Sequence, residues 1–82
     1  MPNKEKTAGE IIRQLRGKGF QSYLVGGCVR DLIMRVQPRD YDIATDALPE
    51  EVSQIFPETI PVGIQFGVQL VIQQENQHEV AT

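Results

Sequence analysis

Apolar residues recur at helical spacing in three segments of this chain of 82 residues. The first segment covers residues 8–16, and Gly17 and Gly19 directly after it favour the end of a helix. The second begins at a glycine pair and keeps its apolar spacing until shortly before Pro38, whose ring disfavours a helical residue in front of it. The third begins at Pro49, a residue suited to the first turn of a helix. The pattern therefore predicts three helices.

Short apolar or alternating segments predict four strands, at residues 22–25, 40–44, 65–73 and 78–81. In the third of these strands we expect the glutamines on the exposed side, and the buried side is expected to carry Phe66, Val68, Leu70 and Ile72. On the last strand His78 and Glu79 point to opposite faces, and we expect His78 at the surface or at an edge of the sheet. This order of helices and strands predicts an α/β (α+β) fold, in which helices pack on one mixed sheet.

The composition is that of one small globular domain. Apolar residues make up 40% of the chain and charged residues 23%, close to ordinary globular usage, so disorder is not expected. The net charge of −3 argues against a protein that holds nucleic acid by bulk positive charge alone. A single cysteine fits a reducing compartment, and the longest apolar run, residues 70–72, is too short to cross a bilayer. We therefore predict a soluble, cytoplasmic protein with no membrane partner.

Two acidic residues, Asp40 and Asp42, stand two positions apart in a predicted strand. Residues at that spacing point to the same side of the strand, and two carboxylates held together repel each other unless a cation lies between them. Carboxylate oxygens are the ligands that Mg²⁺ prefers. On its own, such a pair is more often a solvated edge or a turn than a metal site. Glu79 is the candidate for a third carboxylate, and an ordinary exposed strand glutamate is its equal alternative.

A glycine pair, Gly26 and Gly27, follows a predicted strand and opens a predicted helix. Glycines let backbone N–H groups approach phosphate closely, and a helix N-terminus favours negative charge. Alone, the pair is explained as well by a tight turn, because its spacing matches neither the dinucleotide fingerprint nor the P-loop. In a βαβ-like unit, however, the helix start and the two aspartates would be neighbours. The combination predicts a site that holds a triphosphate over metal ions.

These motifs stand in a longer run of residues that resembles one family. The run comprises residues 23–31, 39–45, 48–52, 55–57, 60–63, 66–67 and 78–82. It resembles the N-terminal head of class II tRNA nucleotidyltransferases (CCA-adding enzymes) and bacterial poly(A) polymerases. The resemblance implies the polymerase-β-like nucleotidyltransferase fold. The chain departs from the family at Met34 and Arg35, which replace a small leucine-glycine turn.

The resemblance also implies roles for individual residues. It implies that Asp40 and Asp42 bind two catalytic Mg²⁺ ions, with Mn²⁺ as a substitute, and that Glu79 is the third catalytic acid. The residues that match the triphosphate-holding segment are Gly26, Gly27, Arg30 and Asp31, of which Asp31 is equally suited to helix capping or to a salt bridge. The implied reaction is the transfer of AMP or CMP from ATP or CTP to the 3′ end of tRNA or another RNA.

Family members continue for hundreds of residues beyond the matching segment. We therefore expect residues 1–82 to form a partial head domain, incomplete at its C-terminus and without the family's neck, body and tail. Two alternatives remain open. One is a stand-alone minimal nucleotidyltransferase that modifies a protein or a small molecule. The other is a vestigial interaction fragment, in which the unfinished last strand leaves an open sheet edge for self-association.

Overall fold

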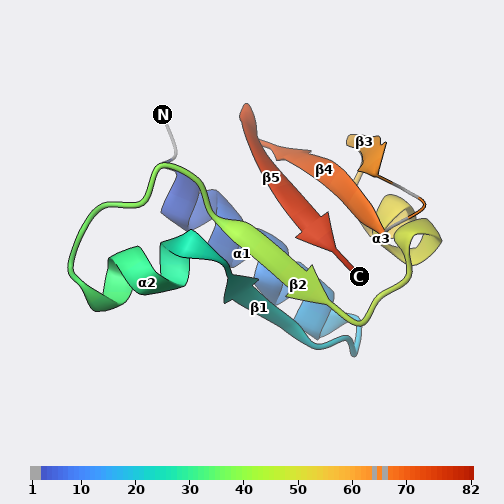
Figure 1. The fold of residues 1–82 in the computed structure, drawn as a ribbon. Coiled ribbons are helices and arrows are strands. Elements are labelled where there is room, and N and C mark those ends of the chain that lie inside the picture. The colour runs from blue at the N-terminus through green and yellow to red at the C-terminus, as the bar shows by residue number, and fades with distance from the viewer. Residues whose placement is uncertain (1–2, 64, 66) are drawn as a thin grey trace.

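The computed structural model describes residues 3–63, 65 and 67–82 (Figure 1). Within this described part, three helices and five strands follow one another along the chain. Their order is α1 (Lys4–Gly17), β1 (Ser22–Val25), α2 (Gly27–Ile33), β2 (Asp42–Thr45), α3 (Pro49–Ile55), β3 (Thr59–Gly63), β4 (Val68–Gln73) and β5 (Asn76–Ala81). The predicted mixed fold is confirmed. No helix in the described ranges has the length and apolar character needed to cross a membrane.

The five strands form a single mixed sheet in the order β1-β2-β5-β4-β3. The β2–β5 pair is parallel, whereas β1–β2, β5–β4 and β4–β3 are antiparallel. The last strand thus lies in the interior of the sheet, between β2 and β4, and the described edges are β1 and β3. The prediction that the last strand leaves an open sheet edge is therefore wrong.

Helix α1 supplies one side of the core and is capped at both ends. The Asn3 side chain accepts a hydrogen bond from the N–H of Lys6 at 2.7 Å, which satisfies one free donor of the first turn. At the other end Gly19 has φ +92°, and the N–H of Phe20 bonds back to the Leu15 carbonyl. This is the closing turn that a glycine after a helix favours. The core that α1 shares with the sheet and α3 comprises Ala8, Ile11, Leu15, Ile43, Val52, Phe56, Val71 and Val80.

The inward face of β4 differs from the prediction. Gln69 and Val71 are the fully buried residues of this strand, whereas Val68, Leu70 and Ile72 are only partly buried. Gln69 is accommodated because its Nε2 donates to the Pro49 carbonyl at 2.6 Å and its Oε1 accepts from the Ser53 hydroxyl at 3.1 Å. The helices cover the glutamine side of the strand, so the predicted burial of the other side is wrong. Phe66, assigned to that other side, lies outside the described residues.

Helix α2 is shorter than the sequence indicates. It ends at Ile33, and Arg35 then takes φ +59°, a left-handed conformation that reverses the chain. Of its residues only Cys28 is fully buried, and its thiol donates to the Val25 carbonyl. Ile33 and Val36 are exposed, so their apolar spacing does not extend the helix towards Pro38 as predicted. The described part of the chain offers these side chains no core to pack against.

Strand β3 was not predicted. It contains Pro61 and ends at Gly63, two residue types that weaken a strand signal. Proline is tolerated here because β3 is an edge strand and pairs only with β4. The edge position therefore explains both the strand and the weakness of its pattern.

Candidate functional site

The glycine turn and the two aspartates meet at one end of the β1–β2 pair. These strands are antiparallel and not the parallel pair of a βαβ unit, so the end of β1 lies beside the start of β2, and Val25 is opposite Asp42. Gly26 follows directly, with φ +83° and ψ −155°, a conformation available essentially to glycine alone. The predicted proximity of the glycine pair and the aspartates is thus found, with a different strand direction.

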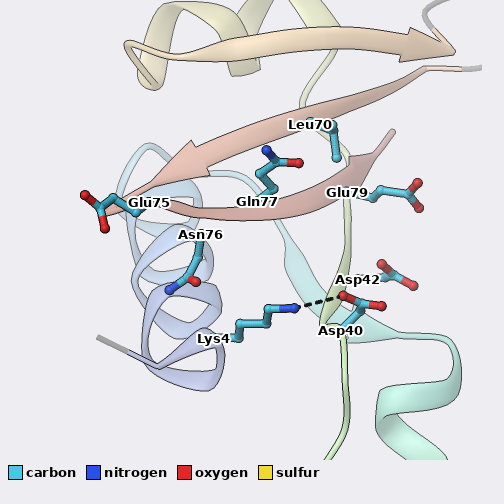
Figure 2. A pocket seen from close by; sticks show the side chains of 8 residues that line it. All are labelled: Lys4, Asp40, Asp42, Leu70, Glu75, Asn76, Gln77 and Glu79. Carbon is cyan, nitrogen blue, oxygen red and sulfur yellow. Dashed lines mark hydrogen bonds and ion pairs between the residues drawn. The ribbon is translucent and has the colours of Figure 1, made fainter. Parts of the chain in front are cut away.

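The third carboxylate is brought alongside by the parallel β2–β5 pair. Ile43 is opposite Val80, which puts the preceding residues, Asp42 and Glu79, side by side on the other face of the sheet. Figure 2 shows the side chains of Asp40, Asp42 and Glu79 close to one another, with Lys4 of α1 reaching Asp40. All three line one open pocket of about 520 Å³. The sheet therefore gathers the predicted acidic residues at one place.

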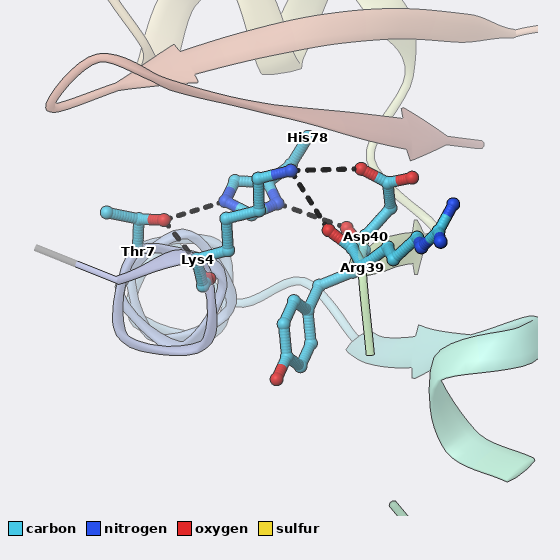
Figure 3. A network of polar contacts seen from close by, with 6 residues as sticks. Lys4, Thr7, Arg39, Asp40 and His78 are labelled. Atoms are coloured by element: carbon cyan, nitrogen blue, oxygen red, sulfur yellow. Dashed lines mark hydrogen bonds and ion pairs between the residues drawn. The ribbon is translucent and has the colours of Figure 1, made fainter. Parts of the chain in front are cut away.

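Asp40 already has a cation beside it. The Lys4 ammonium group, on the first turn of α1, lies 3.2 Å from Asp40 Oδ1 (Figure 2) and donates to the Arg39 carbonyl at 2.9 Å (Figure 3). The two side chains are 46% and 75% exposed, so water screens this ion pair and the pair is weak. An ammonium ion at this carboxylate marks a position where positive charge is favourable.

Asp40 and Asp42 also face a second pocket, on the side of α2. It has a volume of about 360 Å³, and Gly27, Asp31 and Arg39 are among the residues that line it. Arg30 is mostly exposed, and its guanidinium lies 3.3 Å from the Asp31 carboxylate. The structure thus gives Asp31 the salt bridge that was its alternative role, and it puts Gly27 and the two aspartates around a common space.

The donor set suits a hard divalent cation that is shared with a ligand. Among the described residues, no three His, Cys, Asp or Glu side chains form a group that could hold a metal ion by themselves. Mg²⁺ in phosphate-binding sites is held by one or two carboxylates together with substrate phosphates and water. Asp40 and Asp42 provide two such carboxylates on an open face, and the ammonium of Lys4 stands in for a cation at the first of them. These residues fit a metal that arrives with its nucleotide.

His78 does not lie where the sequence indicated. It is 1% exposed, on the core face of β5, and the prediction of a surface or edge position is wrong. Its ring nitrogens contact the Thr7 hydroxyl and the Tyr41 carbonyl (Figure 3). Burial lowers the pKa of His78 below its usual value, and the Tyr41 hydrogen bond opposes this in part.

Three residues at the site were missed by sequence reasoning. Lys4 and His78 reach the aspartate segment from α1 and β5, and no local pattern signals contacts across such sequence distances. Arg39 lines the second pocket and stands next to Asp40 in the sequence, so its position was the one available signal. Tyr41, between the two aspartates, is buried in the core, and burial raises the pKa of its hydroxyl.

Comparison with known proteins agrees with this fold. Residues 22–82 match the family model of the poly A polymerase head domain. Because this match covers more than half of the chain, the chain belongs to that family. The resemblance inferred from the sequence is thereby confirmed.

The relatives carry a common description. The CCA-adding enzyme of Enterococcus faecalis is 46% identical over 82 residues, which are 100% of this chain and 20% of that protein. The CCA-adding enzyme of Bacillus cytotoxicus is 48% identical over 77 residues, which are 94% of this chain and 19% of that protein. The crystal structure of the Bacillus stearothermophilus CCA-adding enzyme in complex with CTP matches with a TM-score of 0.91 and 45% identity, over 100% of this chain and 21% of that one. The chain thus spans about a fifth of the length of these relatives.

Proposed function

We propose that this chain is the metal- and triphosphate-binding head of an enzyme that transfers AMP or CMP from ATP or CTP to the 3′ end of tRNA. The observation that carries the proposal is the meeting of Asp40 and Asp42 with the Gly26–Gly27 turn around shared open space. The relatives described as CCA-adding enzymes, and the solved relative in complex with CTP, support the choice of reaction.

The acidic residues would bind the metal, and the glycine turn would contact the phosphates. Asp40 and Asp42 would hold Mg²⁺, or Mn²⁺ in its place, together with triphosphate oxygens. Gly26 and Gly27 would let first-turn N–H groups, which lack partners within the helix, approach the phosphates. Arg30 and Asp31 flank this turn, and Arg30 would contribute a positive charge towards the triphosphate once it leaves Asp31.

Glu79 completes the acidic face beside Asp42. Its carboxylate would act as the third acidic group, near the attacking hydroxyl of the RNA. Divalent ions bound at the aspartates would activate that hydroxyl and stabilise the departing pyrophosphate. The protein's part would therefore be to hold the two carboxylates at the start of β2, Asp42 on the strand and Asp40 just before it, and to leave their outer side open to nucleotide and RNA.

The proposal extends to the domain organisation. We regard residues 1–82 as one head domain, which would depend on further domains for the choice of base and for binding tRNA. The chain covers about a fifth of its relatives, and both pockets at the carboxylates are open. On its own the chain should bind Mg²⁺ and triphosphate weakly and catalyse poorly or not at all.

A head exchange tests the proposal. Residues 1–82 would replace the matching head of the Bacillus stearothermophilus CCA-adding enzyme, and addition of labelled CTP and ATP to tRNA lacking its 3′ end would be measured with Mg²⁺. We expect addition by the chimera and its loss, by at least about a thousandfold, in Asp42→Ala, because removing a metal-holding carboxylate removes several kcal/mol of charge stabilisation.

Asp46→Ala is the matched control. Asp46 is exposed near the other end of the same strand pair, where its carboxylate accepts from the N–H of Gln21. This variant should keep the rate of the chimera. A folded chimera that adds no nucleotide, or addition that survives Asp42→Ala, would contradict the proposal.

A further inference from the structure

A buried histidine connects the first helix to the aspartate segment. The ring of His78 is 1% exposed, and its Nε2 lies 2.7 Å from the Thr7 hydroxyl of α1. Its Nδ1 lies 3.1 Å from the carbonyl of Tyr41, the residue between Asp40 and Asp42 (Figure 3). One side chain of β5 therefore links α1 to the backbone between the two carboxylates.

The direction of these hydrogen bonds follows from the groups involved. A carbonyl only accepts, so His78 Nδ1 carries the proton that is donated to Tyr41. In the neutral ring Nε2 is then an acceptor, and the Thr7 hydroxyl donates to it. That hydroxyl has a single proton, and its distance to Nε2, 2.7 Å, is shorter than its 3.1 Å to the Lys4 carbonyl. The ring is thus fixed at both nitrogens.

The hydrogen bond between His78 and Tyr41 lies just before the first residue pair that joins β2 to β5. β2 begins at Asp42, and its pairing with β5 joins Ile43 to Val80 and Ala44 to Ala81. Tyr41 precedes these pairs, and its carbonyl is held by the His78 ring instead. With the Tyr41 side chain also buried, the backbone between the aspartates is fixed from both sides. The orientation of that backbone decides where the flanking carboxylates point.

We infer that His78 is a positioning residue for the metal-binding aspartates: through the Tyr41 carbonyl it fixes the backbone that aims Asp40 and Asp42. The inference rests on the proposed function, because it assigns His78 a role in the same site. His78 touches neither metal nor nucleotide in this role. Groups that orient metal ligands from behind typically change metal affinity by 10- to 100-fold when they are removed.

Two substitutions separate positioning from simple support of the fold. Asparagine places its amide nitrogen near the position of Nδ1, and glutamine places its amide near that of Nε2. His78→Asn therefore keeps a donor for Tyr41 and loses the Thr7 contact, whereas His78→Gln does the reverse. Mn²⁺ affinity would be measured by electron paramagnetic resonance on the 82-residue chain, and urea unfolding would be measured on the same samples.

We expect His78→Gln to bind Mn²⁺ about tenfold more weakly than the wild type, and His78→Asn to restore most of the affinity. This order should hold even if His78→Asn is the less stable variant. Equal Mn²⁺ affinities in the two folded variants, or affinities that simply follow stability, would overturn the inference.

Two further variants complete the design. If His78→Gln does not fold, Thr7→Val removes the hydroxyl that fixes the ring and Thr7→Ser keeps it. Weaker Mn²⁺ binding in Thr7→Val with recovery in Thr7→Ser supports the inference, and equal binding overturns it. Asp42→Ala distinguishes a failure of the proposed metal site from a failure of the inference about His78. If the wild type and Asp42→Ala bind Mn²⁺ equally, the proposed metal site fails; if only the His78 and Thr7 variants lack an effect, the inference alone fails.

Discussion

Gly26 and Asp42 approach each other so closely that a β-carbon on Gly26 would lie 3.4 Å from Asp42 Oδ2. The contact joins the turn after β1 to the first residue of β2, and it brings backbone and carboxylate to the edge of the same pocket region. A β-carbon at that distance would still be in ordinary van der Waals contact with the carboxylate, but the backbone there has φ +83° and ψ −155°. The backbone conformation therefore requires glycine at this position.

Gly26→Ala should therefore lower the free energy of unfolding by about 1–3 kcal/mol, the usual cost of a residue with a β-carbon in this conformation. Gly27→Ala is the matched control, because Gly27 is helical and a β-carbon there would meet only Arg30 Nη2, at 3.6 Å. We expect a change within about 0.5 kcal/mol for the control. Urea unfolding of the two variants measures both, and equal losses would contradict this account of the turn.

At Arg35, in contrast to Gly26, a residue with a side chain occupies a backbone conformation that favours glycine. Its φ is +59°, the Val36 N–H bonds back to the Asp31 carbonyl at 2.8 Å, and the Arg35 N–H bonds to the Leu32 carbonyl at 3.1 Å. This is the helix-closing turn in which the left-handed residue is usually glycine. Arg35→Gly should raise the free energy of unfolding by about 1 kcal/mol. Arg35→Ala removes the same charge but keeps a β-carbon, so a similar gain in that variant would contradict the explanation.

We expect the loss of the Lys4–Asp40 ion pair to change metal affinity more than it changes the free energy of unfolding. Both side chains are largely exposed, so Lys4→Met should change the free energy of unfolding by less than about 1 kcal/mol. Because the ammonium competes with a metal for Asp40, the variant should bind Mn²⁺ roughly two- to fivefold more tightly at low salt. Lys6→Met removes the same charge two positions along α1. Equal gains in the two variants would mean that only net charge matters.

The sequence predicts the elements that carry local signals. The end of α1 at its glycines, the strand before Gly26 and the helix after Pro49 each depend on capping or backbone preferences of nearby residues, and each is found. The proximity of the glycine turn to Asp42 was predicted for a βαβ-like unit, but it arises from the antiparallel pairing of β1 and β2, which the order of elements does not determine. Local signals are sufficient for this much of the fold and for the acidic residues of the site.

The sequence could not predict which residues of β4 and β5 are buried, because this depends on which side of the sheet the helices cover. Val68, Leu70 and Ile72 form the more apolar side of β4, yet α1 and α3 pack on the side of Gln69, where Pro49 and Ser53 satisfy its amide. The same choice of side buries His78 and leaves Glu79 on the open face. Contacts between α1 and β5 decide this, and a single strand pattern carries no information about them.

Burial of His78 predicts a change of stability with pH. Its pKa in the folded chain lies below the usual 6.5, so around and below that pH the unfolded chain binds a proton that the folded chain does not. The free energy of unfolding should fall as the pH drops through about 6.5, by at most about 1.4 kcal/mol per pH unit, and this contribution should level off below the folded pKa.

The matching measurement is urea unfolding of the wild type and His78→Asn from about pH 8 to about pH 5 in the presence of a metal chelator. The variant has no imidazole, so the difference between the two curves isolates this group from the carboxylates. The advantage of the wild type should shrink as the pH falls. A difference that stays constant over this range would contradict the lowered pKa.

The central claim is that Asp40, Asp42 and the Gly26–Gly27 turn together hold a metal-bound triphosphate. The most direct measurement is the anomalous diffraction of Mn²⁺ in crystals of this chain grown with MnCl₂ and CTP. We predict an anomalous peak in contact with the carboxylates of Asp40 and Asp42, Lys4 displaced from Asp40, and phosphate oxygens within hydrogen-bonding distance of the turn. A peak elsewhere on the chain, or CTP bound with no peak at the two aspartates, would contradict the account.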